Sequence, residues 1–229
     1  IMSKRFKKLS ENKLKNSETI DKILSKVKSN CTTKFDESID LSLQINNKQK
    51  KGEFNLRTVV NLPSGSGKKI KIAVVCEDSK QKDAKDEGAD IVGGDDLIEK
   101  IKNGNINFEK LICTPSMMIK LSKLGKILGP KGLMPNPKLG TVNENIKKAI
   151  SEAKLGQVEL KNDKDGNVGL SIGKKSFSDE KIIKNFNAVM ETLDREKSNN
   201  PLKKGDLIKS IFITSTMGIS YKLKLGKNI

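Results

Sequence analysis

The residues best suited to ligand binding stand in the segment KLGKILGPKGLMPNPKLGTV, residues 123–142, called here the proline-rich loop. Lysines recur every few positions among four glycines and three prolines. Because proline fixes φ and glycine allows tight turns, one interpretation is a rigid surface loop. The other is a stiff lobe that presents Lys126, Lys131 and Lys138 to phosphate groups. The composition favours neither, although long ordered loops are usually functional.

Glycine and lysine also occur together in LPSGSGKK, residues 62–69. A P-loop would need glycine where Leu62 stands and serine or threonine where Lys69 stands. A dinucleotide-binding GxGxxG pattern would need a third glycine where Ile70 stands. Neither pattern fits, so this segment is interpreted as a flexible connection between domains.

The residue types needed for common catalytic sites are scarce. The sequence contains no histidine, which removes the imidazole base of Ser-His-Asp and Cys-His sites. The three cysteines, Cys31, Cys76 and Cys113, are far apart and form no CxxC pair, so they are expected to be reduced and structural. We therefore predict no catalytic residue, no metal ligand and no cofactor.

The charge balance indicates the class of partner. The 45 basic residues exceed the 28 acidic residues, giving a net charge of +17 and a pI near 9.7. Such an excess points to a polyanion such as nucleic acid. The basic N-terminal residues lack the apolar run of a signal peptide, and no segment approaches the roughly 20 apolar residues of a membrane span. No membrane partner is expected.

The two ends of the chain show patterns typical of an antiparallel sheet with helices. Hydrophobic residues alternate in the first two predicted strands, which are expected to run antiparallel. A DG turn predicts a later hairpin, and an amphipathic helix follows it. These segments are strands at 36–45 and 53–63, the hairpin at 157–173, the helix at 178–197, and a strand, turn and strand at 207–225.

The middle of the chain has a different pattern, in which short apolar strands are predicted to alternate with helices. This order is typical of a parallel sheet covered by helices on both faces. The predicted strands are residues 71–77, 90–94 and 110–115, and the predicted helices are 79–88, 95–104 and 143–156.

We therefore predict two domains in a mixed α+β and α/β fold. A split α+β domain, built on an antiparallel sheet, comprises residues 1–66 plus 158–229. A Rossmann-like α/β domain, residues 67–157, is inserted between them. The split domain carries a net charge of +12 and the insert +5. The main polyanion-binding surface is therefore expected on the split domain.

Two short segments of the split domain leave alternatives open. STMGIS, Ser215 to Ser220, should form the turn between the last two strands. Its glycine would permit a positive φ or a close backbone approach to a partner, although a plain hairpin turn is the simpler interpretation. In TKFDES, Phe35 is by default a core aromatic residue.

The segment TPSMMIKLSKLGKILGPKGLMPNPKLGTV, residues 114–142, closely resembles the signature of the bacterial-type ribosomal protein L-one family of the large subunit. Four further segments match blocks of that family in order, so the resemblance covers nearly the whole chain. They are KFDES, NLPSGSGK, GADIVGGDDLIEKI and STMGIS.

The resemblance implies a monomer within the ribosome that binds the stalk helices of the large-subunit rRNA, mainly through the split domain. It also implies contact with tRNA leaving the exit site and binding to the protein's own messenger RNA as a repressor. The location would be the cytoplasm, with an organellar matrix ribosome as the alternative. The implied RNA face comprises Lys34, Phe35, Ser38, Ser215, Thr216, Met217, Gly218 and Ser220, and the secondary RNA contacts are Lys126, Lys131, Lys138, Lys161, Lys164 and Lys174.

The sequence departs from the family pattern at three positions. Ile219 stands where the family usually has proline, and Ser64 and Gly169 stand where it often has histidine. A softer turn after Gly218 is therefore expected. The alternative function, a Rossmann-like enzyme acting on a nucleotide or nucleic acid, would require a ligand-binding turn after a strand that the sequence does not show.

Overall fold

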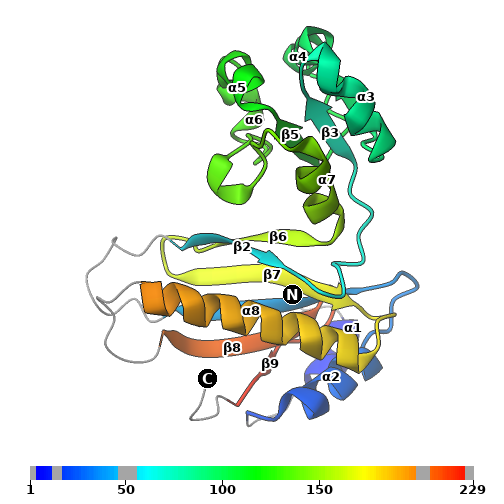
Figure 1. The fold of residues 1–229 in the computed structure, drawn as a ribbon. Coiled ribbons are helices and arrows are strands. Elements are labelled where there is room, and N and C mark those ends of the chain that lie inside the picture. Colours follow the sequence, from blue (N-terminus) through cyan, green and yellow to red (C-terminus); the bar gives the residue numbers. More distant parts are fainter. Residues whose placement is uncertain (1–3, 12–16, 46–55, 200–206, 225–229) are drawn as a thin grey trace. The chain divides into compact units, whose positions relative to one another are not determined.

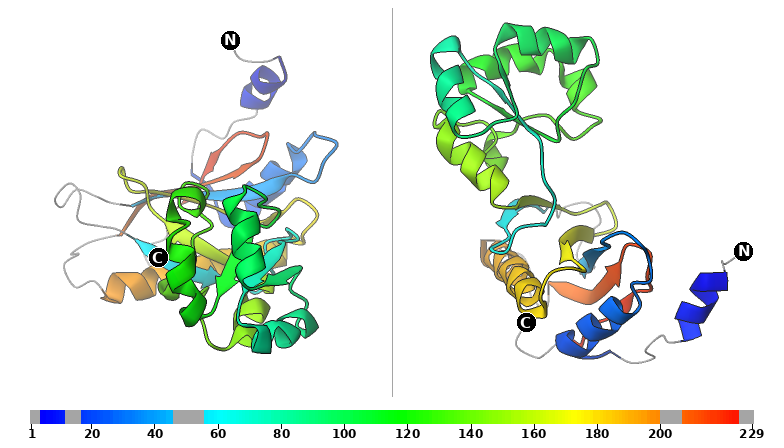
Figure 2. Two further views of the ribbon diagram at one scale, coloured as in Figure 1. Left: turned by 90° about the horizontal axis from the view of Figure 1, so that it is seen from above. Right: turned by 90° about the vertical axis from the view of Figure 1, so that its right-hand side faces the viewer.

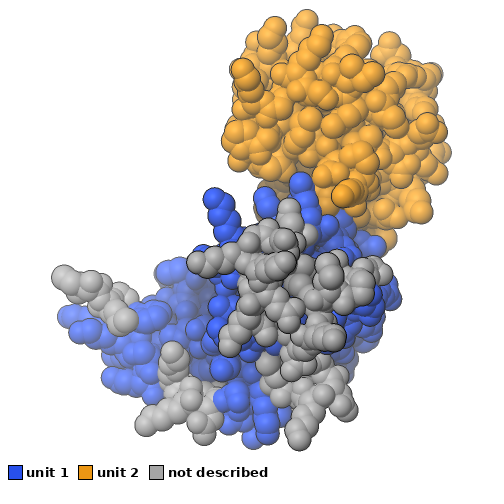
Figure 3. Space-filling view, turned by 90° about the vertical axis from the view of Figure 1, so that its left-hand side faces the viewer, with its two compact units in different colours: residues 1–67, 158–229 blue, residues 68–157 orange. Residues whose placement is uncertain are grey.

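The computed structural model describes residues 4–11, 17–45, 56–199 and 207–224. These residues form a mixed α/β structure with eight α-helices and three sheets (Figure 1). The chain divides into two compact units, coloured separately in Figure 3. Unit 1 is Ile1–Gly67 with Val158–Ile229, and unit 2 is Lys68–Gln157. Among the described residues, no helix has the length and apolar character needed to cross a lipid bilayer.

Unit 1 is built on a four-stranded antiparallel sheet in the order β7-β1-β8-β9. Every second residue of the central strand β1 is buried, from Ile39 to Ile45. These side chains share one apolar core with residues of α2 and α8, which lie along the same side of the sheet (Figure 2). The elements are α1 (Lys4–Glu11), α2 (Ile20–Ser29), β1 (Ser38–Ile45), β7 (Asn167–Lys174), α8 (Asp179–Asn199), β8 (Ile208–Ser215) and β9 (Tyr221–Lys222).

The prediction that the first two strands pair with each other is wrong. β1 pairs with β7 and β8, whereas β2 (Arg57–Asn61) pairs with β6 (Gln157–Lys161) in a separate sheet. Alternation in a sequence shows which face of a strand is buried, but it does not identify the neighbouring strand. The lysine-rich connection at residues 46–52 lies outside the described residues.

Unit 2 has the predicted alternation of strands and helices. Its parallel sheet has the order β4-β3-β5, and β3 is buried on both faces. Ala73 and Val75 pack with residues of α4, α5 and α6, whereas Ile72 and Val74 pack with residues of α3 and α7. The elements are β3 (Ile72–Val75), α3 (Asp78–Asp86), β4 (Ile91–Gly93), α4 (Asp95–Lys102), β5 (Lys110–Cys113), α5 (Pro115–Ser122), α6 (Gly125–Leu128) and α7 (Ile146–Lys154).

The segment before the first crossing into unit 2 is held by a buried asparagine on α8. Asn185 accepts a hydrogen bond from the Ser64 N–H at 2.9 Å and donates to the carbonyls of Gly65 at 3.0 Å and Ile172 at 2.8 Å. Its side chain is fully buried. At Gly67, an added Cβ would lie 2.8 Å from Cγ of Lys174. The prediction of a flexible connection therefore does not apply to residues 62–67, because they are bonded and packed within unit 1.

Candidate nucleic-acid interface

Two segments from opposite ends of the chain meet at one end of the unit 1 sheet. They are residues 33–38, which lead into β1, and residues 215–220, which follow from β8; together they are called here the loop pair. Thr216 Oγ1 accepts a hydrogen bond from the Ser38 N–H at 3.0 Å, and the Thr216 N–H donates to the Ser38 carbonyl at 3.1 Å. Ile39 lies opposite Ser215 in the register. The fold thus brings together all eight residues of the RNA face implied by the resemblance.

The loop pair exposes two large apolar side chains. Phe35 is 52% exposed and Met217 is 49% exposed. The interpretation of Phe35 as a core aromatic is wrong, because the alternation of buried side chains that continues through β1 begins only after Phe35, at Glu37. Lys34, Thr216 and Ser220 are also exposed. These side chains form a mixed surface of apolar, hydroxyl and cationic groups.

Ser215 and Gly218 occupy the inner side of the last turn. The Ser215 side chain is buried, and an added Cβ at Gly218 would lie only 2.3 Å from its Oγ. The φ angle of Gly218 is not in the positive range, so of the alternatives left open the left-handed turn does not occur. A side chain at position 218 would therefore have to displace the Ser215 hydroxyl. Ile219, in place of the family's usual proline, is buried in the apolar core and anchors the turn by packing.

The implied RNA face does not include Glu37, a fully buried acid of the matching segment KFDES. Its Oε1 accepts from the Thr33 hydroxyl at 2.7 Å, and its Oε2 accepts from the Met217 N–H at 3.2 Å. The carboxylate therefore joins the two segments of the loop pair. Glu37 is in phase with Ile39 and the other buried residues of β1, and a glutamate at an inward-facing position was the signal in the sequence.

The pKa of Glu37 reflects two opposing effects. Burial raises the pKa, but hydrogen bonds from the Thr33 hydroxyl and from the Met217 and Thr33 N–H groups, together with the nearby Ser215 hydroxyl, outweigh burial and lower it below the ordinary value. The Ser215 hydroxyl itself makes no full hydrogen bond. Glu37 is thus ionised at neutral pH and is held by uncharged donors.

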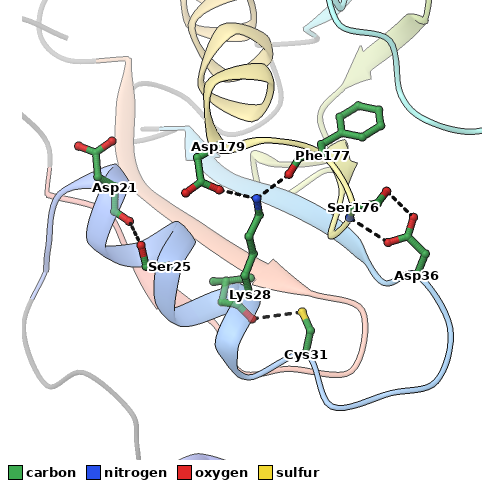
Figure 4. A network of polar contacts seen from close by, with 9 residues as sticks. Asp21, Ser25, Lys28, Cys31, Asp36, Ser176, Phe177 and Asp179 are labelled. Atoms are coloured by element: carbon green, nitrogen blue, oxygen red, sulfur yellow. Dashed lines mark hydrogen bonds and ion pairs between the residues drawn. The ribbon is translucent and has the colours of Figure 1, made fainter.

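The first segment of the loop pair is also fixed on its other side by the connection between β7 and α8 (Figure 4). The Asp36 carboxylate accepts from the Ser176 N–H at 3.1 Å and from the Ser176 hydroxyl at 2.8 Å. Lys28 Nζ donates to the Phe177 carbonyl at 2.6 Å and pairs with Asp179. The loop before β1 is therefore bonded both to the connection between β7 and α8 and to the second segment of the loop pair.

Among the predicted secondary contacts, Lys174 lies beside the loop pair. It is opposite Ser38 in the register, and its Nζ is 3.5 Å from the Asp36 carbonyl oxygen. Lys161 and Lys164 lie near the other end of β7, roughly 20 Å away at about 3.3 Å per strand residue. They are not part of the same surface. Asp40 is the nearby acid on β1, and burial raises its pKa against the opposing effects of Ser171 and Lys174.

The proline-rich loop in unit 2 is closed by internal hydrogen bonds. The Thr141 hydroxyl donates to the Asn136 carbonyl at 3.1 Å and accepts from the Asn136 N–H at 2.8 Å. Leu133 and Met134 pack against the apolar core. Lys126, Lys131 and Lys138 are all exposed. Both interpretations of this segment expect an internally bonded loop with exposed lysines, so contact with phosphate groups stays a prediction.

The carboxyl ends of the unit 2 strands, where open α/β sheets bind ligands, offer little support for enzyme chemistry. β3 is followed by the carboxylates of Glu77 and Asp78, which would repel a phosphate. Burial raises the pKa of the Cys113 thiol to about 11, so this cysteine is a poor nucleophile at neutral pH. Within the described ranges, no group of three or more potential metal ligands occurs.

Comparison with known proteins identifies the family. Residues 27–219 match the family model of the Ribosomal protein L1p/L10e family. The chain is 68% identical over 228 residues to the large ribosomal subunit protein uL1 of Pelagibacter ubique (strain HTCC1062), with 99% of each chain covered. It is 42% identical over 202 residues to the uL1 proteins of Rickettsia akari (strain Hartford) and Rickettsia africae (strain ESF-5), covering 88% of this chain and 84% of each relative. The chain therefore belongs to the ribosomal protein L1p/L10e family, whose members are structural ribosomal proteins of the large subunit and not enzymes.

Proposed function

We propose that this protein binds the stalk helices of the large-subunit rRNA through the loop pair. The observation that carries the proposal is the joint exposure of Phe35 and Met217 beside the bonded pair Ser38 and Thr216. A single exposed apolar side chain is common on protein surfaces, but two large ones on adjoining loops give a partner an apolar contact area. Here they stand among hydroxyl groups and lysines in a protein with a net charge of +17.

The chemistry of the loop pair suits structured RNA with unpaired bases. An exposed phenylalanine can stack on a base, hydroxyl and backbone groups can bond the 2′-OH, and lysines can neutralise phosphates. The hydrogen bonds of the Glu37 and Asp36 carboxylates hold the loop pair in one conformation, so little conformational entropy is lost on binding. These features favour specific recognition over general attraction to polyanions.

We further propose that the two compact units are domains with separate roles. Unit 1 would hold the main rRNA site, and the lysines of the proline-rich loop in unit 2 would give secondary contacts. The net charges of the predicted domains, +12 and +5, agree with this division. A test is to link residues 1–67 directly to residues 158–229. This shortened chain should keep most of the RNA affinity, and unit 2 alone should not.

The remaining roles are proposed from the family resemblance. They are assistance in the release of deacylated tRNA from the exit site and repression of the protein's own messenger, which would then carry a structure like the rRNA site. The protein would act as a monomer within the ribosome. The similarity to bacterial uL1 proteins favours a bacterial cytoplasmic ribosome over an organellar one.

A footprint of the purified protein on total rRNA tests the main proposal. Protection should be confined to structured helices of the large-subunit stalk. The affinity for that RNA should exceed the affinity for a scrambled duplex of equal length. Equal affinity for the two RNAs would instead indicate a general basic architectural protein.

A further inference from the structure

The buried Glu37 carboxylate connects the two segments of the loop pair on their inner side. We propose that Glu37 is a positioning residue for RNA recognition, which sets the shape of both segments before RNA arrives. The inference rests on the proposed RNA-binding function of the loop pair. Because Glu37 is 0% exposed, it cannot touch RNA itself and must act through the residues that it holds.

Each carboxylate oxygen serves a different segment. Oε1 accepts from Thr33 in the first segment, and Oε2 accepts from the Met217 N–H in the second. The Glu37 carbonyl also accepts from the Lys175 N–H at 2.8 Å, which fixes the backbone of Glu37 itself. The Glu37 carboxylate thus joins the two segments as a bridge, and the backbone that carries it is itself held by a hydrogen bond.

The bridge controls residues that are exposed above it. With its N–H turned inward to Glu37, the Met217 residue directs its side chain outward, where it is about half exposed. The Thr33 hydroxyl that donates to Glu37 also lies 3.3 Å from the Phe35 carbonyl oxygen, so the same group closes the loop that carries Phe35. Both exposed apolar side chains are therefore positioned by one buried group.

A purely structural role would not require a carboxylate. Burying a charge is costly, and a well-packed apolar side chain of similar size often stabilises a core equally well. Such a side chain could fill the space, but it could not draw the Met217 N–H and the Thr33 hydroxyl toward one point. A glutamate at this position is explained if the orientation of the two segments is important for RNA recognition.

The test compares Glu37→Gln, Met217→Ala and the double variant in the full-length protein. The amide keeps the size of the side chain, but one of its two ends becomes a donor facing a donor. The affinity of Glu37→Gln for stalk RNA should fall about tenfold, as expected for the loss of a hydrogen bond to a charged group. In the Met217→Ala background, the same substitution should cost less than in the wild-type background, because the part of its effect that acts through the Met217 side chain is already absent.

Val189→Ala provides a matched control for lost stability. Val189 is fully buried on α8 in the same core, away from the loop pair, so its truncation leaves a cavity without touching the bridge. Its RNA affinity should stay within about twofold of wild type at temperatures where the protein is folded. In amide NMR spectra, the Met217 signal should move in Glu37→Gln and stay in place in Val189→Ala.

The outcomes separate the inference from the proposed function. If Met217→Ala and Phe35→Ala weaken binding but Glu37→Gln does not, or if the losses simply add in the double variant, the positioning role is wrong. If Met217→Ala and Phe35→Ala both bind like wild type, the loop pair is not the RNA site, and both proposals fail. Should Glu37→Gln not fold, Thr33→Val removes one arm of the bridge and should still lower affinity by about threefold.

Discussion

The loop pair and the proline-rich loop reach rigidity by different routes. The loop pair joins residues 178 positions apart in the sequence through the bonds between Ser38 and Thr216, and a buried carboxylate lies beneath it. The proline-rich loop is continuous in sequence and is closed by a bond between near neighbours, Asn136 and Thr141. The first region depends on the whole sheet, whereas the second depends mainly on its own residues.

The two regions also expose different groups. The loop pair turns Phe35 and Met217 outward, whereas the proline-rich loop packs Leu133 and Met134 inward and exposes lysines. Lysines neutralise phosphates on any nucleic acid, but stacking and close backbone contact depend on the shape of the RNA. Under the proposed function, this difference predicts that the loop pair gives specificity and that the proline-rich loop adds affinity without discrimination.

The largest expected effect is that of Gly218→Val. A side chain at this position must displace the buried Ser215 hydroxyl, which lies 2.3 Å from the Cβ position, and so distorts the turn. Affinity for stalk RNA should fall by about 2 kcal/mol or more while the protein stays folded, because a surface turn carries little of the core. RNA titration with circular dichroism as the folding check measures this. Gly125→Val, where a Cβ meets no atom within 4 Å, is the control and should bind nearly as wild type.

Phe35→Ala should have the next largest effect. If the half-exposed ring stacks on a base, its loss should lower specific affinity by about 1–3 kcal/mol. Binding to a scrambled duplex should change little. Ile119→Ala removes a more exposed apolar side chain from α5 in unit 2, and its affinity should match wild type. Equal losses in the two variants would contradict the difference drawn between the regions.

Lys131→Ala should weaken binding by less than about 1 kcal/mol, and equally for stalk RNA and scrambled duplex. The side chain is an exposed lysine of the proline-rich loop, so its loss removes one charge without altering any recognition surface. The slope of log affinity against log salt concentration should become shallower by about 0.7–0.9. A loss confined to stalk RNA would place specific recognition in this loop.

The smallest expected effect concerns the pH dependence of stability. The folded-state pKa of Glu37 is lowered, so its carboxylate stabilises the fold above the ordinary pKa of about 4.3, and this contribution is lost as the pH falls through the lower, folded value. Urea unfolding from pH 3 to 7 should show the advantage of wild type over Glu37→Gln shrinking below about pH 4.

Asp40→Asn is the contrasting variant in the same experiment. The pKa of Asp40 is raised by burial, so its charge disfavours the fold at neutral pH, and that penalty disappears as the pH falls through the raised value. The difference between wild type and Asp40→Asn should therefore change in the opposite direction to that of Glu37→Gln. Parallel changes would show that the two carboxylates do not have the opposed environments described above.

Much of the local structure follows from the sequence. The alternation from Ile39 to Ile45 predicts a half-buried strand, and the apolar run of β3 predicts a strand covered on both faces. The spacing of apolar residues in 178–197 likewise predicts α8. These signals succeed because the period of burial is fixed by the geometry of the single element.

The candidate site was harder to predict. The exposure of Phe35 and the role of Glu37 contradict the simple expectation that aromatic residues are buried and charged residues are exposed. The tight contact at position 218 arises from the Ser215 side chain and not from the backbone angle of Gly218. The local pattern indicates that Glu37 faces inward, but it does not identify the partners of Glu37 or of Gly218.

The net charge of +17, the absence of histidine, the types and approximate limits of most elements, and the resemblance to a ribosomal family can all be read from the order of residues. The neighbours of each strand become clear only in the folded protein, where β1 pairs with β7 and β8 and not with β2. The fold also brings Glu37 to Met217 across 180 positions. The reason is physical: burial periodicity is a property of one segment, whereas pairing and buried hydrogen bonds are settled by the packing of segments distant in the chain.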